Sequence, residues 1–95
     1  MSSPYTLIDT LYMYADQHAP DDPVFLKIFP EVKEENRHIK EIVQSRTETP
    51  EVKLIALLDF LYQWFPDSIS DEEQDEITAH MNAAEAWLKQ NKEKS

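Results

Sequence analysis

The segment that decides the fold runs from residue 49 to residue 66 and reads TPEVKLIALLDFLYQWFP. Thr49 directly precedes Pro50. This pair is typical of a helix start, because threonine can accept an unpaired backbone N–H and proline at the first helical position has none to leave unpaired. Pro66 indicates the end of the helix, since proline disfavours helical backbone in the residue before it. The segment therefore predicts a helix over 50–65, the most apolar of the chain.

Apolar side chains cover an unusually wide part of this helix. They fill an arc of about 220°, whereas the apolar stripe of an ordinary surface helix is about 100° wide. Two interpretations remain open. The helix is central and contacts all its neighbours, or part of the arc forms a homodimer or partner interface with Phe60, Trp64 and Tyr14 as aromatic anchors.

Three further helix starts are visible in the sequence. Ser3-Pro4 and Asp22-Pro23 repeat the pairing of a capping residue with proline, and Ser70 with Glu73 forms a capping box. We predict an all-α fold with helices over 4–18, 23–46, 50–65 and 71–90, the second kinked at Pro30. A one-turn segment joined to a longer helix is the alternative for 23–46. Short loops favour a four-helix bundle in a single domain over 1–95, with a disordered tail over 91–95.

Helical spacing also predicts which residues of the other three helices face the core. We expect apolar stripes of four, seven and five residues: Ile8, Leu11, Tyr12 and Ala15; Phe25, Ile28, Phe29, Val32, Ile39, Ile42 and Val43; and Ile77, Met81, Ala84, Trp87 and Leu88.

Composition excludes many classes of protein. The chain has no cysteine, which rules out disulfides, zinc ribbons, iron–sulfur clusters and a thiol nucleophile. It has no glycine, which rules out the glycine-dependent nucleotide-binding, nucleophile-elbow and EF-hand motifs. A net charge of −10 argues against binding nucleic acid or an anionic membrane. No signal peptide is visible, and the apolar run over 54–65 is too short to span a bilayer, so we expect a cytoplasmic protein.

Negative charge is unevenly distributed along the chain. Residues 27–53 contain six acidic and six basic residues, whereas residues 54–88 contain eight acidic residues and no basic one. One interpretation is a solvated helix start, where acids are favoured by the helix dipole. The other is a surface that steers and docks a basic partner. The densest acidic patch consists of Asp67, Asp71, Glu72, Glu73, Asp75 and Glu76.

Evidence for chemistry is weak by comparison. Glu35 and His38 have the Glu-x-x-His spacing of di-iron bundles, but such bundles use two of these motifs, so we expect no metal and no cofactor. Asp59 is the one candidate for a general acid, on the condition that it is buried. A ligand pocket lined by Tyr12, Tyr62 and His80 is a further hypothesis. We expect the protein not to be an enzyme.

The leading functional hypothesis is a small acidic interaction module that binds, and inhibits or masks, a basic protein partner. Its concrete forms are an immunity, antirestriction or nucleic-acid-mimic protein. The acidic patch over 67–76 would supply the attraction, with help from Asp9, Asp16, Asp21 and Asp22. The alternative is a structural homo-oligomer, a homodimer for example, that uses surplus apolar surface of the first and third predicted helices.

Overall fold

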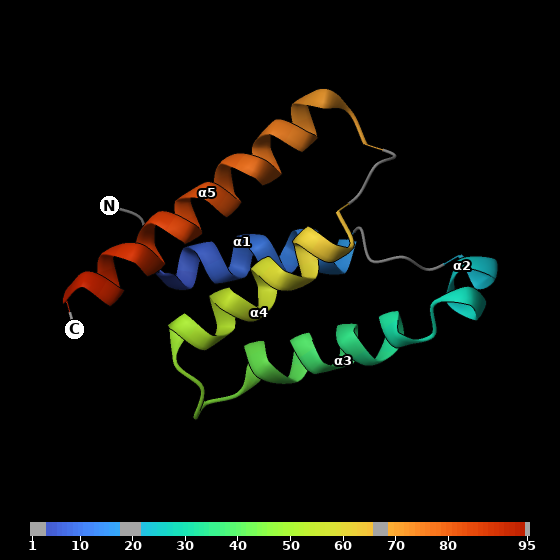
Figure 1. Ribbon diagram of the computed structural model, residues 1–95, viewed down its shortest axis with the longest axis horizontal. Helices are drawn as coiled ribbons and strands as arrows, with labels where there is room; N and C mark the ends of the chain where they lie inside the picture. The colour runs from blue at the N-terminus through green and yellow to red at the C-terminus, as the bar shows by residue number, and fades with distance from the viewer. Residues whose placement is uncertain (1–3, 18–21, 66–68, 95) are drawn as a thin grey trace.

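The computed structural model describes residues 4–17, 22–65 and 69–94, which form helices joined by short loops and contain no strand (Figure 1). In this part of the chain α1 spans Pro4–Gln17, α2 Pro23–Ile28, α3 Glu31–Gln44, α4 Pro50–Gln63 and α5 Asp71–Lys94. The predicted all-α class is therefore confirmed. None of the helices within these residues combines the length and the apolarity needed to cross a membrane.

Helices α1 and α4 form the centre of the molecule. α1 packs against α4, α5 and α3, and α4 also packs against α3 and α5. α3 and α5 lie on opposite sides of this central pair, and their described residues do not contact each other (Figure 1). The interpretation of 50–65 as a central helix is confirmed, because α4 contacts all three other long helices. The molecule is thin, with dimensions of 45 × 32 × 17 Å along its principal axes.

The core is made of aliphatic side chains with one phenylalanine and one methionine. Among the described residues no polar or charged side chain is buried. The predicted stripes of the first and last helices supply most of what α1 and α5 bury. The buried cluster consists of Leu7, Ile8, Leu11, Ala15, Ile39, Leu54, Leu57, Leu58, Phe60, Leu61, Ile77, Met81 and Ala84.

Capping side chains accept backbone N–H groups at the N-termini of α2, α4 and α5. Asp22 Oδ1 accepts a hydrogen bond from the backbone N–H of Val24 at 2.9 Å, and Thr49 Oγ1 accepts one from Val52 at 3.3 Å. Ser70 caps α5 in the same way. Each cap satisfies a backbone donor that the helix itself leaves unpaired, which stabilises a helix by about 1 kcal/mol. The predicted caps of Asp22 and Thr49 and the Ser70 half of the predicted capping box are confirmed, while Ser3 lies outside the described residues.

The predicted kink at Pro30 is a complete break. Phe29 has φ −122° and ψ 71°, outside the helical region, as expected for a residue that precedes proline. α2 therefore ends at Ile28, and α3 begins after Pro30, as the alternative of a short segment joined to a longer helix predicted. The break also ends the continuous apolar stripe. Val32 and Ile39 are buried, but Ile28 is 64% exposed and Phe29 is 39% exposed.

Other helix ends differ from the prediction by a few residues. α3 ends at Gln44 and α4 at Gln63, each two residues earlier than predicted. α5 continues to Lys94, four residues past its predicted end and into the segment expected to be disordered. There the Asn91 side-chain amide donates to the carbonyl of Trp87 at 3.0 Å. Residue 18, the predicted end of the first helix, lies outside the described residues.

Candidate functional site

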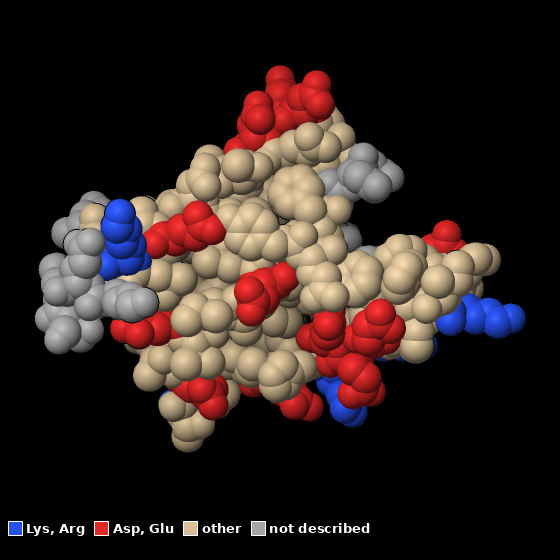
Figure 2. Space-filling model, in the orientation of Figure 1, with Lys and Arg blue, Asp and Glu red and all other residues tan. Residues whose placement is uncertain are grey.

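Acidic side chains crowd the first turns of α5, in a group we call the α5 acidic cluster: Asp71, Glu72, Glu73, Asp75 and Glu76. All five are exposed, and Figure 2 shows acidic groups at this end of the molecule, with others spread over α3 and α4. The Ser70 hydroxyl accepts the backbone N–H of Glu73 at 3.2 Å. At this capped helix start the carboxylates face solvent, and the partial positive charge at the N-terminal end of the helix dipole stabilises them. Asp67, the sixth residue of the predicted patch, lies outside the described residues.

The α5 acidic cluster lies away from the basic residues of α3. The described parts of α3, which carries Lys33, Arg37 and Lys40, do not contact α5. Arg37 instead pairs with Glu34 of its own helix at 2.6 Å. Within the described residues, Asp71, Glu72, Asp75 and Glu76 form no ion pair. Their negative charge is therefore not neutralised by the basic residues that occur earlier in the chain.

The three predicted aromatic anchors are in different environments. Phe60 is only 4% exposed, so it belongs to the core and is not a surface anchor in this fold. Trp64 is half-buried against Phe25 of α2 and against Phe29, which follows α2, with ring centroids 5.7 and 5.9 Å away. Tyr14 is half-buried with its ring edge-on to His80 at 5.7 Å. The structure does not bring these three side chains together on one surface.

Tyr14 is the anchor that adjoins the α5 acidic cluster. Burial, together with the negative charges of Glu76 and Glu73, raises the pKa of the Tyr14 phenol. His80, which packs against it, has its Nδ1 atom 2.8 Å from the carbonyl oxygen of Glu76. Tyr14 therefore lies near Glu73 and Glu76 of the acidic cluster, where α1 contacts α5.

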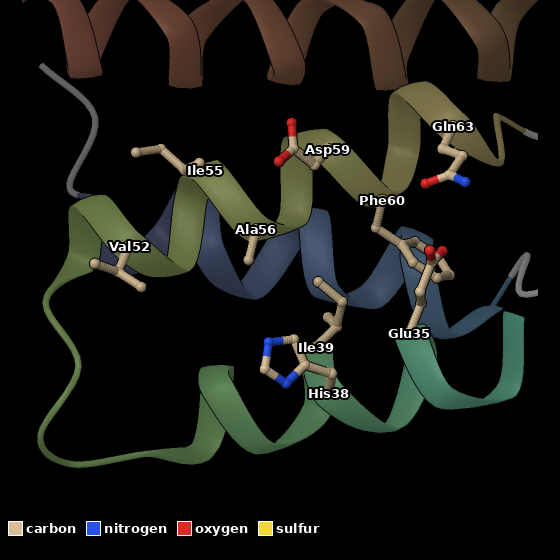
Figure 3. Close-up of a pocket in the computed structure, with 9 residues that line it drawn as sticks. All are labelled: Glu35, His38, Ile39, Val52, Ile55, Ala56, Asp59, Phe60 and Gln63. Atoms are coloured by element: carbon tan, nitrogen blue, oxygen red, sulfur yellow. The ribbon is translucent and has the colours of Figure 1, made fainter. Parts of the chain in front are cut away.

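A second surface feature is an open groove between α3 and α4, with a volume of about 420 Å³ (Figure 3). Buried or half-buried Ile39, Ala56 and Phe60 form its apolar part. Polar side chains from both helices stand around it in Figure 3. No lysine or arginine is among the described residues that line it, which are Glu35, His38, Ile39, Val52, Ile55, Ala56, Asp59, Phe60 and Gln63.

The groove collects residues that the sequence analysis considered separately for catalysis and metal binding. Glu35 Oε2 accepts a hydrogen bond from Trp64 Nε1 at 2.5 Å, so its role in this structure is to hold the end of α4 against α3. Asp59 is exposed, and the burial on which a general-acid role depended is absent. His38 lines the same groove and is exposed. The described residues contain no group of three histidine or carboxylate side chains that could hold a metal ion.

None of Tyr12, Tyr62 and His80 is among the described residues that line the groove between α3 and α4. Tyr12 is half-buried on α1, and burial with the nearby charge of Asp16 raises its pKa. Tyr62 is exposed on α4, where its hydroxyl donates to the carboxylate of Glu85 on α5. That hydrogen bond, with some burial and the charge of Glu85, raises the pKa of Tyr62. The hypothesis of a ligand pocket formed by these three residues therefore stays a prediction.

Comparison with protein-family models, with curated protein sequences and with solved structures gives no match.

The groove between α3 and α4 was not predicted from the sequence, because its lining comes from two helices whose relative placement the sequence pattern does not give. One sequence feature could have indicated the groove: the part of α4 outside the wide apolar arc, which contains Val52, Ala56, Asp59 and Gln63. All four line the groove.

Proposed function

We propose that this protein is an acidic interaction module, built as a four-helix bundle of α1, α3, α4 and α5, which binds and masks a basic protein partner. The observation that carries the proposal is the α5 acidic cluster. Its carboxylates are exposed, and those of Asp71, Glu72, Asp75 and Glu76 form no ion pair with described residues. Clustered charge of one sign accelerates association with a surface of the opposite sign and disfavours partners of like sign.

The charge of the chain suggests the class of partner. Proteins that bind or cut nucleic acids concentrate lysine and arginine where they contact phosphates. An acidic surface that occupies such a site competes with the nucleic acid, as in an immunity, antirestriction or nucleic-acid-mimic protein. Tyr14 can add an aromatic contact beside the cluster, because it is only half-buried and lies near Glu73 and Glu76.

The test begins with affinity capture of the partner from the native host, followed by measurement of association kinetics with the purified partner at several salt concentrations. The informative variant carries Glu72→Lys, Asp75→Lys and Glu76→Lys. We expect its association rate to fall at least about tenfold at low salt, since steering by clustered charge raises association rates by 10 to 1,000 times. We also expect a shallower salt dependence, because fewer attractive charges remain to be screened.

A matched control keeps the same change in net charge but places it elsewhere. Glu41→Lys, Glu48→Lys and Glu51→Lys change exposed acids around the loop between α3 and α4. If this control slows association as much as the cluster variant does, net charge alone is responsible and the cluster is not the docking surface. An unchanged association rate in the cluster variant would remove the cluster from the mechanism.

A homo-oligomer is the second candidate function, and exposed apolar side chains on α1 and α4 favour it. Met13 is 50% exposed and Ile55 is 51% exposed. Light scattering at micromolar concentration tests this candidate: a monomer eliminates it, and a dimer that Ile55→Asp dissociates supports it. Trp64→Ala is unsuited to this test, because Trp64 makes intramolecular contacts with α2 and α3. The cytoplasmic location and the absence of catalysis stay predictions.

A further inference from the structure

Helix α4 carries an exposed stripe with the spacing of a helix-pairing surface. The stripe consists of Val52, Ile55, Asp59 and Tyr62, at positions i, i+3, i+7 and i+10. This is the alternating three- and four-residue spacing of the positions that meet between paired helices. The three apolar members are 40%, 51% and 58% exposed. We call this surface the α4 stripe; its side chains stay exposed in the described part of the chain, and Tyr62 at its end also donates a hydrogen bond to Glu85 of α5.

The groove beside the α4 stripe has room for side chains of an added helix. Val52, Ile55 and Asp59 belong both to the stripe and to the lining of the groove. The groove is about 420 Å³ in volume and has an apolar floor of Ile39, Ala56 and Phe60. A helix laid along α4 would place its side chains in this space by ridge-into-groove packing.

Charge determines what kind of helix fits. Asp59 stands in the middle of the α4 stripe, Glu35 lines the groove on the α3 side, and Glu85 adjoins Tyr62 on the α5 side. The described lining contains no lysine or arginine to balance these carboxylates. An acid at a central pairing position favours a partner that presents a cation there, because a carboxylate covered without one is destabilising.

A second copy of this chain is a poorer fit to the same surface. Its own α4 stripe would bring another Asp59 to the interface instead of a cation. Each copy also carries a net charge of −10, which opposes self-association.

We propose that the α4 stripe and its groove bind an amphipathic helix of a basic partner, with a lysine or arginine of that helix against Asp59. The partner's apolar side chains pack on Ile55 and over Phe60. This proposal rests on the proposed function and adds the place and the form of the contact. The α5 acidic cluster then attracts the partner, and the α4 stripe holds it.

The test uses two synthetic amphipathic peptides of about three heptads each, with leucine at the pairing positions. One peptide has lysine at its central pairing position and the other has glutamate there. A central position meets Asp59 in either helix orientation. Binding to the full-length, nitrogen-15-labelled protein is followed through backbone amide shifts. We expect shifts confined to α4 and the facing side of α3, and binding of the lysine peptide at least about tenfold tighter than of the glutamate peptide.

Protein variants make the test reciprocal. Asp59→Lys should reverse the preference so that the glutamate peptide binds more tightly. Ile55→Asp should weaken binding of the lysine peptide at least about tenfold, because it removes the apolar contact at the centre of the surface. Ile28→Asp is the matched control, since Ile28 is also an exposed isoleucine, 64% exposed on α2 against 51% for Ile55, and it should leave binding unchanged. Circular dichroism verifies that each variant is folded.

Several outcomes would overturn the proposal. These are no binding of either peptide, equal binding of both, no reversal by Asp59→Lys, or shifts centred on α2 or α5. A dimer that Ile55→Asp dissociates would assign the surface to a second copy instead. The proposed function is tested separately from this inference. If binding of a captured partner depends on the α5 acidic cluster but not on Asp59 or Ile55, the proposed function is supported and only this inference is overturned.

Discussion

At the scale of single residues, Trp64 makes contacts that join three helices. Its ring lies against Phe25 of α2 and against Phe29 just after that helix. Its indole N–H donates to Glu35 of α3, and the residue itself follows the last turn of α4. A large ring with one polar atom suits this position, because it buries apolar area and still satisfies its single donor. The aromatic side chain that resembled a partner anchor in the sequence thus serves as an internal contact.

Tyr62 supplies a pH-dependent contact between α4 and α5. Its hydroxyl donates to Glu85, and this bond is the main reason that its pKa lies above the ordinary value of 10.0. A raised pKa in the folded state means that the contribution to stability is fully present below pH 10 and is lost as the pH rises through the higher folded value. We therefore expect wild type to be more stable than Tyr62→Phe at pH 8, with the difference shrinking above pH 10.

Urea unfolding of both proteins at a series of pH values measures this difference in the free energy of unfolding. A general effect of high pH acts on both proteins, so the difference between them isolates the Tyr62 hydroxyl. A stability difference that is constant from pH 8 to pH 11 would contradict the assigned hydrogen bond.

At the scale of elements, α2 is the most weakly attached helix. It contains six residues, none of them buried, and it packs against α3 and against Trp64. A helix this short is not stable alone in water, because the free-energy cost of helix nucleation exceeds what its few hydrogen bonds contribute. Its order therefore depends on its aromatic contacts and on the cap from Asp22.

Replacing Trp64 by alanine should loosen α2 before the rest of the molecule. Native-state hydrogen exchange should show faster exchange over 25–29 at conditions where α1 and α5 keep most of their protection, since local opening needs only the α2 contacts to break. Trp64→Phe should have a smaller effect, because it retains a ring and loses only the bond to Glu35. Equal acceleration in every helix would show that Trp64 acts on global stability alone.

At the scale of the whole molecule, the net charge of −10 means that carboxylates repel one another over the surface of a small protein. Asp71 with Asp75, and Glu72 with Glu76, are i, i+4 pairs on α5, and each such pair is destabilising by a few tenths of a kcal/mol. Salt screens this repulsion, since the Debye length falls to about 10 Å at 0.1 M. We therefore expect this repulsion to destabilise the folded state less as the ionic strength rises.

We expect the free energy of unfolding of the wild type to increase by about 1 kcal/mol between low salt and about 0.3 M sodium chloride. The neutralised variant with Glu72→Gln, Asp75→Asn and Glu76→Gln should show a smaller increase, because it lacks the closest repulsive pairs. Urea unfolding at each salt concentration gives both values. An equal increase in the two proteins would mean that the salt effect does not come from the α5 acidic cluster.

Particular positions show how much could be predicted from sequence. The helix starts at Pro23, Pro50 and Asp71 and the stripe of Ile77, Met81 and Ala84 were predicted correctly. The break at Pro30 was predicted only as a kink, because the apolar spacing continues across it and gives no sign that Ile28 is exposed. The groove was not predicted, and the sequence left open whether Phe60 lies in the core or at an interface.

The amino-acid sequence by itself determined the helices, their capped starts, the apolar content of α4 and the excess of carboxylates. These features depend on contacts between residues two to four apart and on composition, so they can be read along the chain. Only the tertiary structure decided that Phe60 is buried, that Trp64 binds α2 and α3, and that Ile55 and Asp59 remain exposed beside a groove. The physical reason is that packing of helices distant in sequence selects which part of a wide apolar arc is covered, and local periodicity does not contain that choice.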